Sequence, residues 1–335
     1  MMKQTIAFNR RLALRARASC VGPKEGKGPL GWCFDRVLKD DLLGQATWEL
    51  AESEMLRQTV SLCLERGGLM PDQLELLASG DLLNQLMPSC FMARALGRPF
   101  MGLYGACSTF VEAMILCGVM IDGGYRKNAV CAASSHFCTA ERQFRSPLEL
   151  GTQRPPSAQW TATAAGAALM DTAKAPAAAR LTHGTLGRVI DYEVTDANHM
   201  GAAMAPAVAD TILAHFEDTG RDFSDYDRVI TGDLGWIGRN LLRELLRERG
   251  VAVADEKLAD CGASLFSQEQ DPHAGGSGCG CVASVSCGYV LRKIEEGAWE
   301  RVLLVASGAL LSPTSSQQGQ SIPGIAYAAA LEADE

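Results

Sequence analysis

Cys107 stands where a run of small residues meets a segment of helical character, and a thiol at such a place can do chemistry. The run reads GACST at 105–109 and continues as FVEAM, a good helix beginning. Unpaired backbone N–H groups and the positive end of the helix dipole would favour the reactive thiolate, and could hold an oxyanion or a carboxylate. The alternative is a small residue packed at a tight strand–helix junction.

His273 precedes a second run of small residues, AGGSGCGC at 274–281, about 170 residues later. If the two runs converge in space, His273 and Cys107 face one cavity, where a neutral imidazole could donate a hydrogen bond or act as a general base. The alternative is a loop histidine that contacts solvent. The second run lacks the Lys-Ser/Thr ending of a phosphate-binding P-loop, so phosphate binding is a weak hypothesis.

Asp81 and Asp233 are each the middle residue of a Gly-Asp-Leu sequence at the end of a strand-like stretch. Ligands of α/β proteins bind at the carboxyl ends of strands, which makes both carboxyls candidates for a site. Either one could instead cap the turn that follows its strand.

Three arginines lie close together in the sequence of an otherwise acidic protein: Arg142, Arg145 and Arg154. Guanidinium forks bind carboxylates in a bidentate manner, so they suggest an anionic ligand. The alternative is that they make contacts between subunits or ion pairs with Glu141 and Glu149.

The elements that would position these side chains occur twice. Strand-like stretches at 76–82 and 229–234 are each followed by a run of small residues, a helical segment and a second buried strand, at 129–134 and 302–307. Strands that alternate with helices predict mostly parallel sheets covered on both faces. Two repeats of this order predict two stacked sheets that share internal helices.

The predicted fold is therefore a duplicated α/β body with five layers, α/β/α/β/α, and pseudo-twofold halves. An Ala/Pro-rich stretch at 172–179 marks the seam, which gives an N-terminal half at 1–172 and a C-terminal half at 173–335.

Composition excludes several classes of protein. The 335 residues are 47% hydrophobic and 21% charged with a net charge of −8, and no basic tail or stripe predicts nucleic-acid binding. The longest mostly apolar run, 111–121, is far shorter than the ~20 residues of a membrane span. The 12 cysteines form no C-x-x-C pair, so we expect reduced intracellular thiols and no metal site.

Several motifs together resemble the family of stage V sporulation protein AD, within the thiolase and ketoacyl-synthase superfamily. They lie at 105–109, 134–137 (SSHF), 139–145 (TAERQFR), 153–160 (QRPPSAQW), 273–281, 308–313 (GALLSP), 317–318 and 322–325 (IPGI). The resemblance implies a thiolase-like fold and a homodimer. It also implies uptake of dipicolinic acid, with its calcium, into the developing forespore, by a soluble member of the stage V sporulation protein A complex at the spore inner membrane.

Two hypotheses for the function follow. In the first, the pocket binds dipicolinic acid without turnover and needs no cofactor besides calcium brought with the ligand. The candidate ligand-binding residues are Cys107, His136, Arg142, Arg145, Arg154, Asp233 and His273. In the second, Cys107 with His273 serves a coenzyme A thioester-dependent acyltransferase or a ketoacyl-synthase-like condensing enzyme. Asp233 stands where condensing enzymes would place a histidine, and its negative charge would oppose a carbanion or an enolate.

Overall fold

The long strand β1 (Thr5–Val21) joins the two halves of the molecule. The computed structural model describes residues 3–144 and 154–334, and within them β1 belongs to an 11-stranded sheet. Its first part pairs antiparallel with β8 (Ala179–Leu186), and its second part pairs antiparallel with β7 (Ala164–Asp171). A register shift between Leu14 and Ala16, of the kind that bends a strand, lies where one ladder gives way to the other.

The order of strands is the same on either side of β1 and β8. One half-sheet has the order β4-β3-β5-β7-β1 and the other β10-β9-β12-β13-β8, so strands at equal places in the chain take equal places in the sheet. The remaining strands are β2 (Arg36–Val37), β3 (Leu77–Gly80), β4 (Phe100–Gly102), β5 (Asn128–Ser135), β6 (Trp160–Thr161), β9 (Arg228–Thr231), β10 (Leu258–Asp260), β11 (Gly276–Ser277), β12 (Arg301–Ala309) and β13 (Gly324–Glu332).

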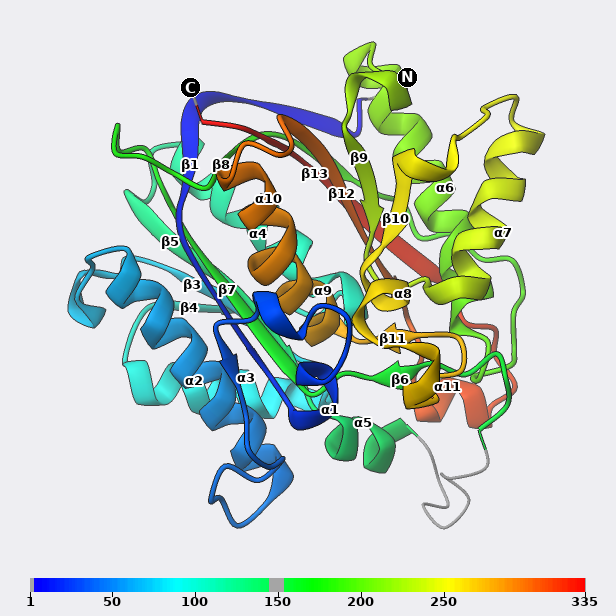
Figure 1. Ribbon diagram of the computed structural model, residues 1–335, viewed down its shortest axis with the longest axis horizontal. Coiled ribbons are helices and arrows are strands. Elements are labelled where there is room, and N and C mark those ends of the chain that lie inside the picture. Colours follow the sequence, from blue (N-terminus) through cyan, green and yellow to red (C-terminus); the bar gives the residue numbers. More distant parts are fainter. Residues whose placement is uncertain (1–2, 145–153, 335) are drawn as a thin grey trace.

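Helices cover both outer faces and fill the space between the half-sheets, as the five-layer prediction requires (Figure 1). The outer pairs are α2 (Trp48–Arg66) with α3 (Met87–Leu96), and α6 (Met200–Thr219) with α7 (Gly235–Glu248); the inner helices are α4 (Thr109–Asp122), α9 (Cys279–Val285) and α10 (Leu291–Glu295). The shorter helices are α1 (Pro23–Gly26), α5 (Phe137–Phe144), α8 (Cys261–Leu265) and α11 (Pro313–Gln317). The predicted layered α/β fold class with two equivalent halves is confirmed.

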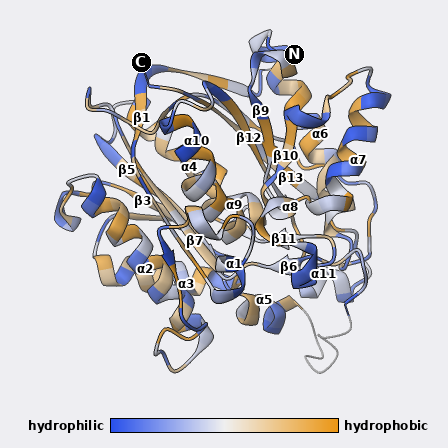
Figure 2. Cartoon of the chain, viewed as in Figure 1, coloured by the Kyte–Doolittle hydropathy of each residue, from blue (hydrophilic) through white to orange (hydrophobic). Residues whose placement is uncertain are grey.

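Hydropathy explains why α4 lies inside. Its sequence, TFVEAMILCGVMID, is apolar on nearly every side, and a helix of that kind is stable only where all its faces are covered. The side chains of α4 and α9 form one hydrophobic cluster with strands of both halves, whereas α7 keeps charged residues on its outward face (Figure 2). Among the described residues no helix combines the length and the apolar character needed to cross a membrane.

The prediction of mostly parallel sheets is wrong for part of each half. The pairs β1–β2, β3–β4, β3–β5, β9–β10 and β9–β12 are parallel, but β1–β7, β1–β8, β8–β13, β5–β7 and β12–β13 are antiparallel. A parallel pair needs a crossover connection, which α3 and α4 supply in the first half. The chain returns from β12 to β13 with only the short α11 between them, so the pair is antiparallel.

Backbone contact between α9 and β7 holds the central layer in place. A Cβ on Gly166 of β7 would lie 2.2 Å from the carbonyl oxygen of Ala283, and one on Gly280 of α9 would lie 2.3 Å from that of Ala164. No side chain fits between this helix and this strand.

Gly166→Ala should therefore lower the free energy of unfolding by about 3 kcal/mol, the upper end of the cost of overpacking, since the obstructing atoms belong to the backbone. Gly220→Ala is the control: its Cβ meets nothing within 4 Å, and only the φ of +70° opposes it, at a cost of about 1 kcal/mol. Urea titrations of both variants measure the difference. Equal losses would contradict the close helix–strand contact.

Candidate functional site

Cys107 is presented by a tight turn at the start of α4. Ala106 has a φ of +52°, a left-handed conformation that is unfavourable for a residue with a Cβ. Side-chain hydroxyls hold the turn: Ser108 Oγ donates to the carbonyl of Gly105 at 2.6 Å and Thr109 Oγ1 donates to that of Ala106 at 2.7 Å. The predicted helix start is confirmed, and it leaves Cys107 only 5% exposed.

Asp233 and the loop around β11 lie against this thiol. The Sγ of Cys107 lies 3.9 Å from the Oγ of Ser277. Ser277 Oγ donates to Asp233 Oδ2 at 3.0 Å, and the N–H of Gly278 donates to the same oxygen at 2.8 Å. The end of β9 and the second small-residue run therefore meet at the start of α4, as the duplication predicts.

The expectation of a thiolate at Cys107 is wrong. Burial, followed by the negative charge of Asp233, raises the pKa of the thiol well above its usual value. A helix start offers only partial positive charge, which does not offset the loss of water together with a nearby carboxylate. Burial also raises the pKa of Asp233. The site therefore holds a neutral thiol.

His273 contacts the loop around Pro155 and Asp271 of its own loop. Its Nδ1 lies 2.9 Å from the carbonyl oxygen of Pro155, and its Nε2 lies 3.3 Å from Asp271 Oδ1. No hydrogen bond or ion pair between described residues joins it to Cys107. Ser277, four residues further along, is the residue of this run that contacts the thiol.

His136 is buried with both ring nitrogens occupied by backbone groups. Its Nε2 lies 2.8 Å from the carbonyl oxygen of Asp41, and its Nδ1 accepts from the N–H of Cys138 at 3.2 Å. Burial lowers the pKa of the ring, so it is neutral and donates through Nε2. These contacts fix the start of α5 to the loop around Asp41.

The three arginines do not converge on one described point. Arg142 pairs with Glu49, an acid that the sequence did not suggest, and its guanidinium lies 5.9 Å from the centre of the Trp48 ring. Arg145 lies outside the described residues. Arg154 lies elsewhere, with Nη2 3.4 Å from the carbonyl oxygen of Pro272.

A cluster of cations and aromatic rings around Trp160 was missed by sequence reasoning. Lys24 Nζ lies 3.6 Å and the guanidinium of Arg154 4.8 Å from the centre of the Trp160 ring, and Phe137 stacks on it at 3.9 Å. Burial, and then the charge of Arg154, lowers the pKa of Lys24. The only sequence signal for Lys24 was its place in a turn-rich loop, far from every motif.

This cluster adjoins the Cys107 site through the small sheet β6–β11. Trp160 pairs with Gly276 and Thr161 pairs with Ser277. Trp160 is therefore one residue along β6 from Thr161, the partner of the serine that contacts the thiol. We call the combination of Cys107, Asp233, Ser277, Lys24, Arg154 and Trp160 the composite site.

Asp81 and Asp233 end equivalent strands but have different roles. The carboxylate of Asp81 accepts from the N–H groups of Leu83 and Ser89, each at 2.9 Å, and so caps the start of α3. The capping alternative applies to Asp81, whereas Asp233 serves the composite site.

The cysteines and acids offer no evident metal centre in the described part of the chain. All 12 cysteines are free thiols, buried except for Cys90 and Cys138. No group of three or more His, Cys, Asp or Glu among the described residues is placed to hold a metal ion.

Comparison with known proteins places this sequence in a family. A family model described as Stage V sporulation protein AD matches residues 2–332. Stage V sporulation protein AD of Bacillus subtilis (strain 168) is 42% identical over 330 residues, which cover 98% of this chain and 97% of that protein.

Solved structures of two enzymes share the fold. The 3-oxoacyl-(acyl-carrier-protein) synthase III of Aquifex aeolicus covers 97% of this chain and 100% of its own, with a TM-score of 0.59 at 14% identity. Human mitochondrial 3-ketoacyl-CoA thiolase, solved in complex with CoA, covers 98% and 100%, with a TM-score of 0.60 at 12% identity. At such identities the likeness shows the fold alone.

Asp233→Asn should make Cys107 more reactive, because it removes the negative charge that faces the thiol. A fall of one unit in the thiol pKa gives about a tenfold faster alkylation at pH 8. The rate is measured with iodoacetamide by peptide mass, relative to the exposed Cys90 in the same molecule. An unchanged ratio of the two rates would show that Asp233 does not control the thiol.

The free energy of unfolding should fall as the pH rises, because the buried carboxyl of Glu52 resists ionisation in the folded protein. Glu52 accepts from Ser134 Oγ at 3.0 Å and Thr139 Oγ1 at 2.9 Å, and burial, with the charge of Asp81 second, raises its pKa from 4.5 to about 8. The folded protein thus keeps a proton that the unfolded chain has lost. Stability is full below about pH 4.5, falls by about 1.4 kcal/mol per pH unit up to about pH 8, and is level above.

Glu52→Gln should remove this contribution and flatten the curve of unfolding free energy against pH between 5 and 8. Glu248→Gln, which changes an exposed carboxyl on α7, serves as the control. If denaturant titrations at several pH values give parallel curves for the wild type and Glu52→Gln, the carboxyl is ionised throughout this range.

Proposed function

The chain belongs to the family of stage V sporulation protein AD and therefore has a role in sporulation, and on that premise we propose that the composite site binds dipicolinic acid for uptake into the forespore, without covalent turnover.

The paired cations over Trp160 carry this proposal. Dipicolinic acid is a flat pyridine with two carboxylates, and Lys24 and Arg154 offer an ammonium and a guanidinium beside one aromatic ring. Both cations favour carboxylates, and the guanidinium can bind one of them with two hydrogen bonds. The neighbouring Cys107, Ser277 and Asp233 would form the uncharged or hydrogen-bonding end of the pocket.

The state of Cys107 supports binding over catalysis. Acyl transfer begins with attack by a thiolate, and the raised pKa of this buried thiol disfavours that form. Condensation also needs donors aimed at a developing enolate, whereas the second half places the carboxyl of Asp233, an acceptor, beside the thiol.

We further propose that calcium enters as the counter-ion of dipicolinic acid, whose carboxylate oxygens are ligands that calcium prefers. The other subunits of the stage V sporulation protein A complex would hold the protein at the spore inner membrane. A homodimer is supported by the open edge of β4, the last strand of its half-sheet, where Met101 and the neighbouring Tyr104 are 39% and 44% exposed.

The second candidate is an acyltransferase that uses a coenzyme A thioester. The tight turn with Ala106 at positive φ favours it, since backbone strain of this kind is common where a nucleophile must be presented. Incubation with acetyl- or malonyl-coenzyme A followed by intact mass would reveal an adduct on Cys107. Such an adduct, absent from Cys107→Ala, would replace the binding proposal.

Calorimetric titration with dipicolinic acid should show saturable binding, with phthalate and coenzyme A as comparison ligands. Lys24→Gln should weaken binding at least about tenfold, because a hydrogen bond to a charged group contributes about 1.5–3 kcal/mol. Cys107→Ala should also weaken it by altering the pocket floor. Arg188→Gln is the control, since Arg188 is exposed and pairs with Asp210. Wild-type affinity in Lys24→Gln would refute the proposed location.

A further inference from the structure

A cavity of about 270 Å³, separate from the composite site, lies against the middle of β1 and the end of α10. None of its lining residues belongs to the composite site. The charged side chains that line it are Arg15, Arg17, Arg66, Arg292, Asp35 and Glu295. Four guanidiniums around one cavity are unexpected in a chain whose net charge is −8.

One of the two acids is fully used by the fold. Asp35 pairs with Arg66 at 2.7 Å, and its other oxygen accepts from the N–H of Ser19 at 2.8 Å and from the Ser19 hydroxyl at 3.0 Å. Asp35 therefore anchors the loop before β2 to β1, and it holds Arg66 at the cavity wall.

The other acid is easily displaced. Glu295 pairs with Arg17, but its side chain is 51% exposed and sits near the end of α10. Arg17 also donates through Nη1 to the carbonyl of Cys287 at 2.9 Å, while its buried Nε has no hydrogen-bond partner among the described residues. An anion in the cavity could take the place of Glu295 and use that Nε.

Arg292 lacks an acidic partner altogether within the described part of the chain. Its Nε is buried without a hydrogen-bond partner, and its guanidinium lies 5.8 Å from the centre of the Trp32 ring, which is 59% exposed. Buried N–H groups are normally paired, so two such guanidinium groups at one cavity indicate a missing acceptor.

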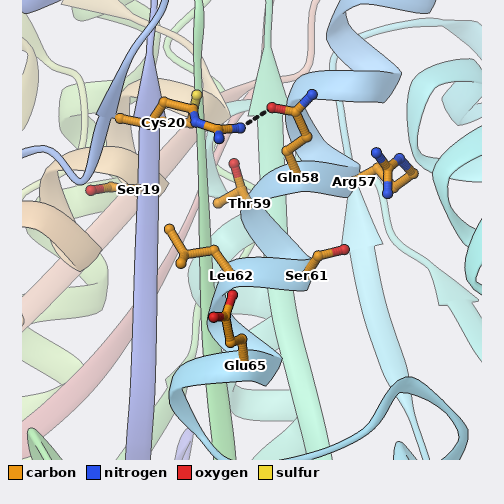
Figure 3. A pocket seen from close by; sticks show the side chains of 9 residues that line it. Ser19, Cys20, Arg57, Gln58, Thr59, Ser61, Leu62 and Glu65 are labelled. Atoms are coloured by element: carbon orange, nitrogen blue, oxygen red, sulfur yellow. Dashed lines mark hydrogen bonds between the residues drawn. The ribbon is translucent and has the colours of Figure 1, made fainter.

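A neighbouring hollow, between β1 and α2, shows the opposite arrangement (Figure 3). There Arg57 is held by Glu54 through two hydrogen bonds of 2.7 Å, Arg36 donates to Gln58, and Glu65 adds a further negative charge. Its arginines are satisfied by their own surroundings, which makes Arg57 a matched control.

We propose that the cavity beside Arg292 binds a small oxyanion of the phosphate class that carries at least two negative charges. The guanidiniums of Arg17 and Arg292 donate to its oxygens, and Glu295 swings out to solvent. Arg15 and Arg66 line the walls, where Asp171 and Asp35 pair with them. Bidentate guanidinium contacts suit the tetrahedral oxygens of such an anion.

Pyrophosphate is the probe, titrated into the full-length protein at constant ionic strength with Trp32 fluorescence and calorimetry as readouts. Arg292→Gln should weaken binding about tenfold or more, and Arg292→Lys only in part. Glu295→Gln should tighten it, because the competing carboxylate is gone. Arg57→Gln should leave it unchanged.

Vesicles distinguish a lipid headgroup from a free anion. Sedimentation with phosphatidylglycerol vesicles, lost in Arg292→Gln and absent with phosphatidylcholine, assigns the cavity to a headgroup; pyrophosphate binding without sedimentation assigns it to a free anion. Absence of both, or equal weakening by Arg292→Gln and Arg57→Gln, overturns the proposal. Dipicolinic acid affinity should be the same in Arg292→Gln and wild type, so this test is independent of the composite site.

Discussion

The direct contact between the backbones of α9 and β7 determines how closely the central helix packs against the first half-sheet. Because Gly166 and Gly280 carry no side chains, the central helix lies against one half-sheet while α4 reaches both. The same closeness fixes where the helices begin: a Cβ on Gly280 would lie 2.6 Å from the backbone N of Ser135, at the end of β5. The helix starts and the strand ends therefore meet at one place, where the composite site forms.

Exclusion of water from that place decides its chemistry. Burial raises the pKa of Asp233, that of Asp260 to about 6 and that of Glu52 to about 8, all on elements near the strand ends. Burial in such surroundings makes the ionisation of carboxyls and thiols less favourable than in water. A thiol whose pKa is raised thus lies beside a buried carboxyl at the start of α4, while the cations Lys24 and Arg154 lie further along, against the Trp160 ring.

The repeated features were readable from the sequence, and the contacts between distant segments were not. The Gly-Asp-Leu sequences at Asp81 and Asp233 predicted the duplicated strand order, and the two repeats together predicted a shared inner layer of helices. The pKa of Cys107 is raised by burial and then by the charge of Asp233, and both arise only when the chain folds. Lys24 lies in α1, near the start of the first half, and Trp160 lies near its end, so no local pattern in the sequence could have linked the two.

The sharing of β1 between two ladders also bears on how the chain is made. β1 is synthesised before the other described strands, yet residues 5–7 and 12–14 pair with β8, which follows all the strands of the first half. Until β8 exists, a nascent N-terminal half has an unsatisfied strand edge, the kind of surface that pairs wrongly with other chains. Vectorial synthesis thus leaves this protein dependent on its second half for protection of the first, and the two copies act as one folding unit.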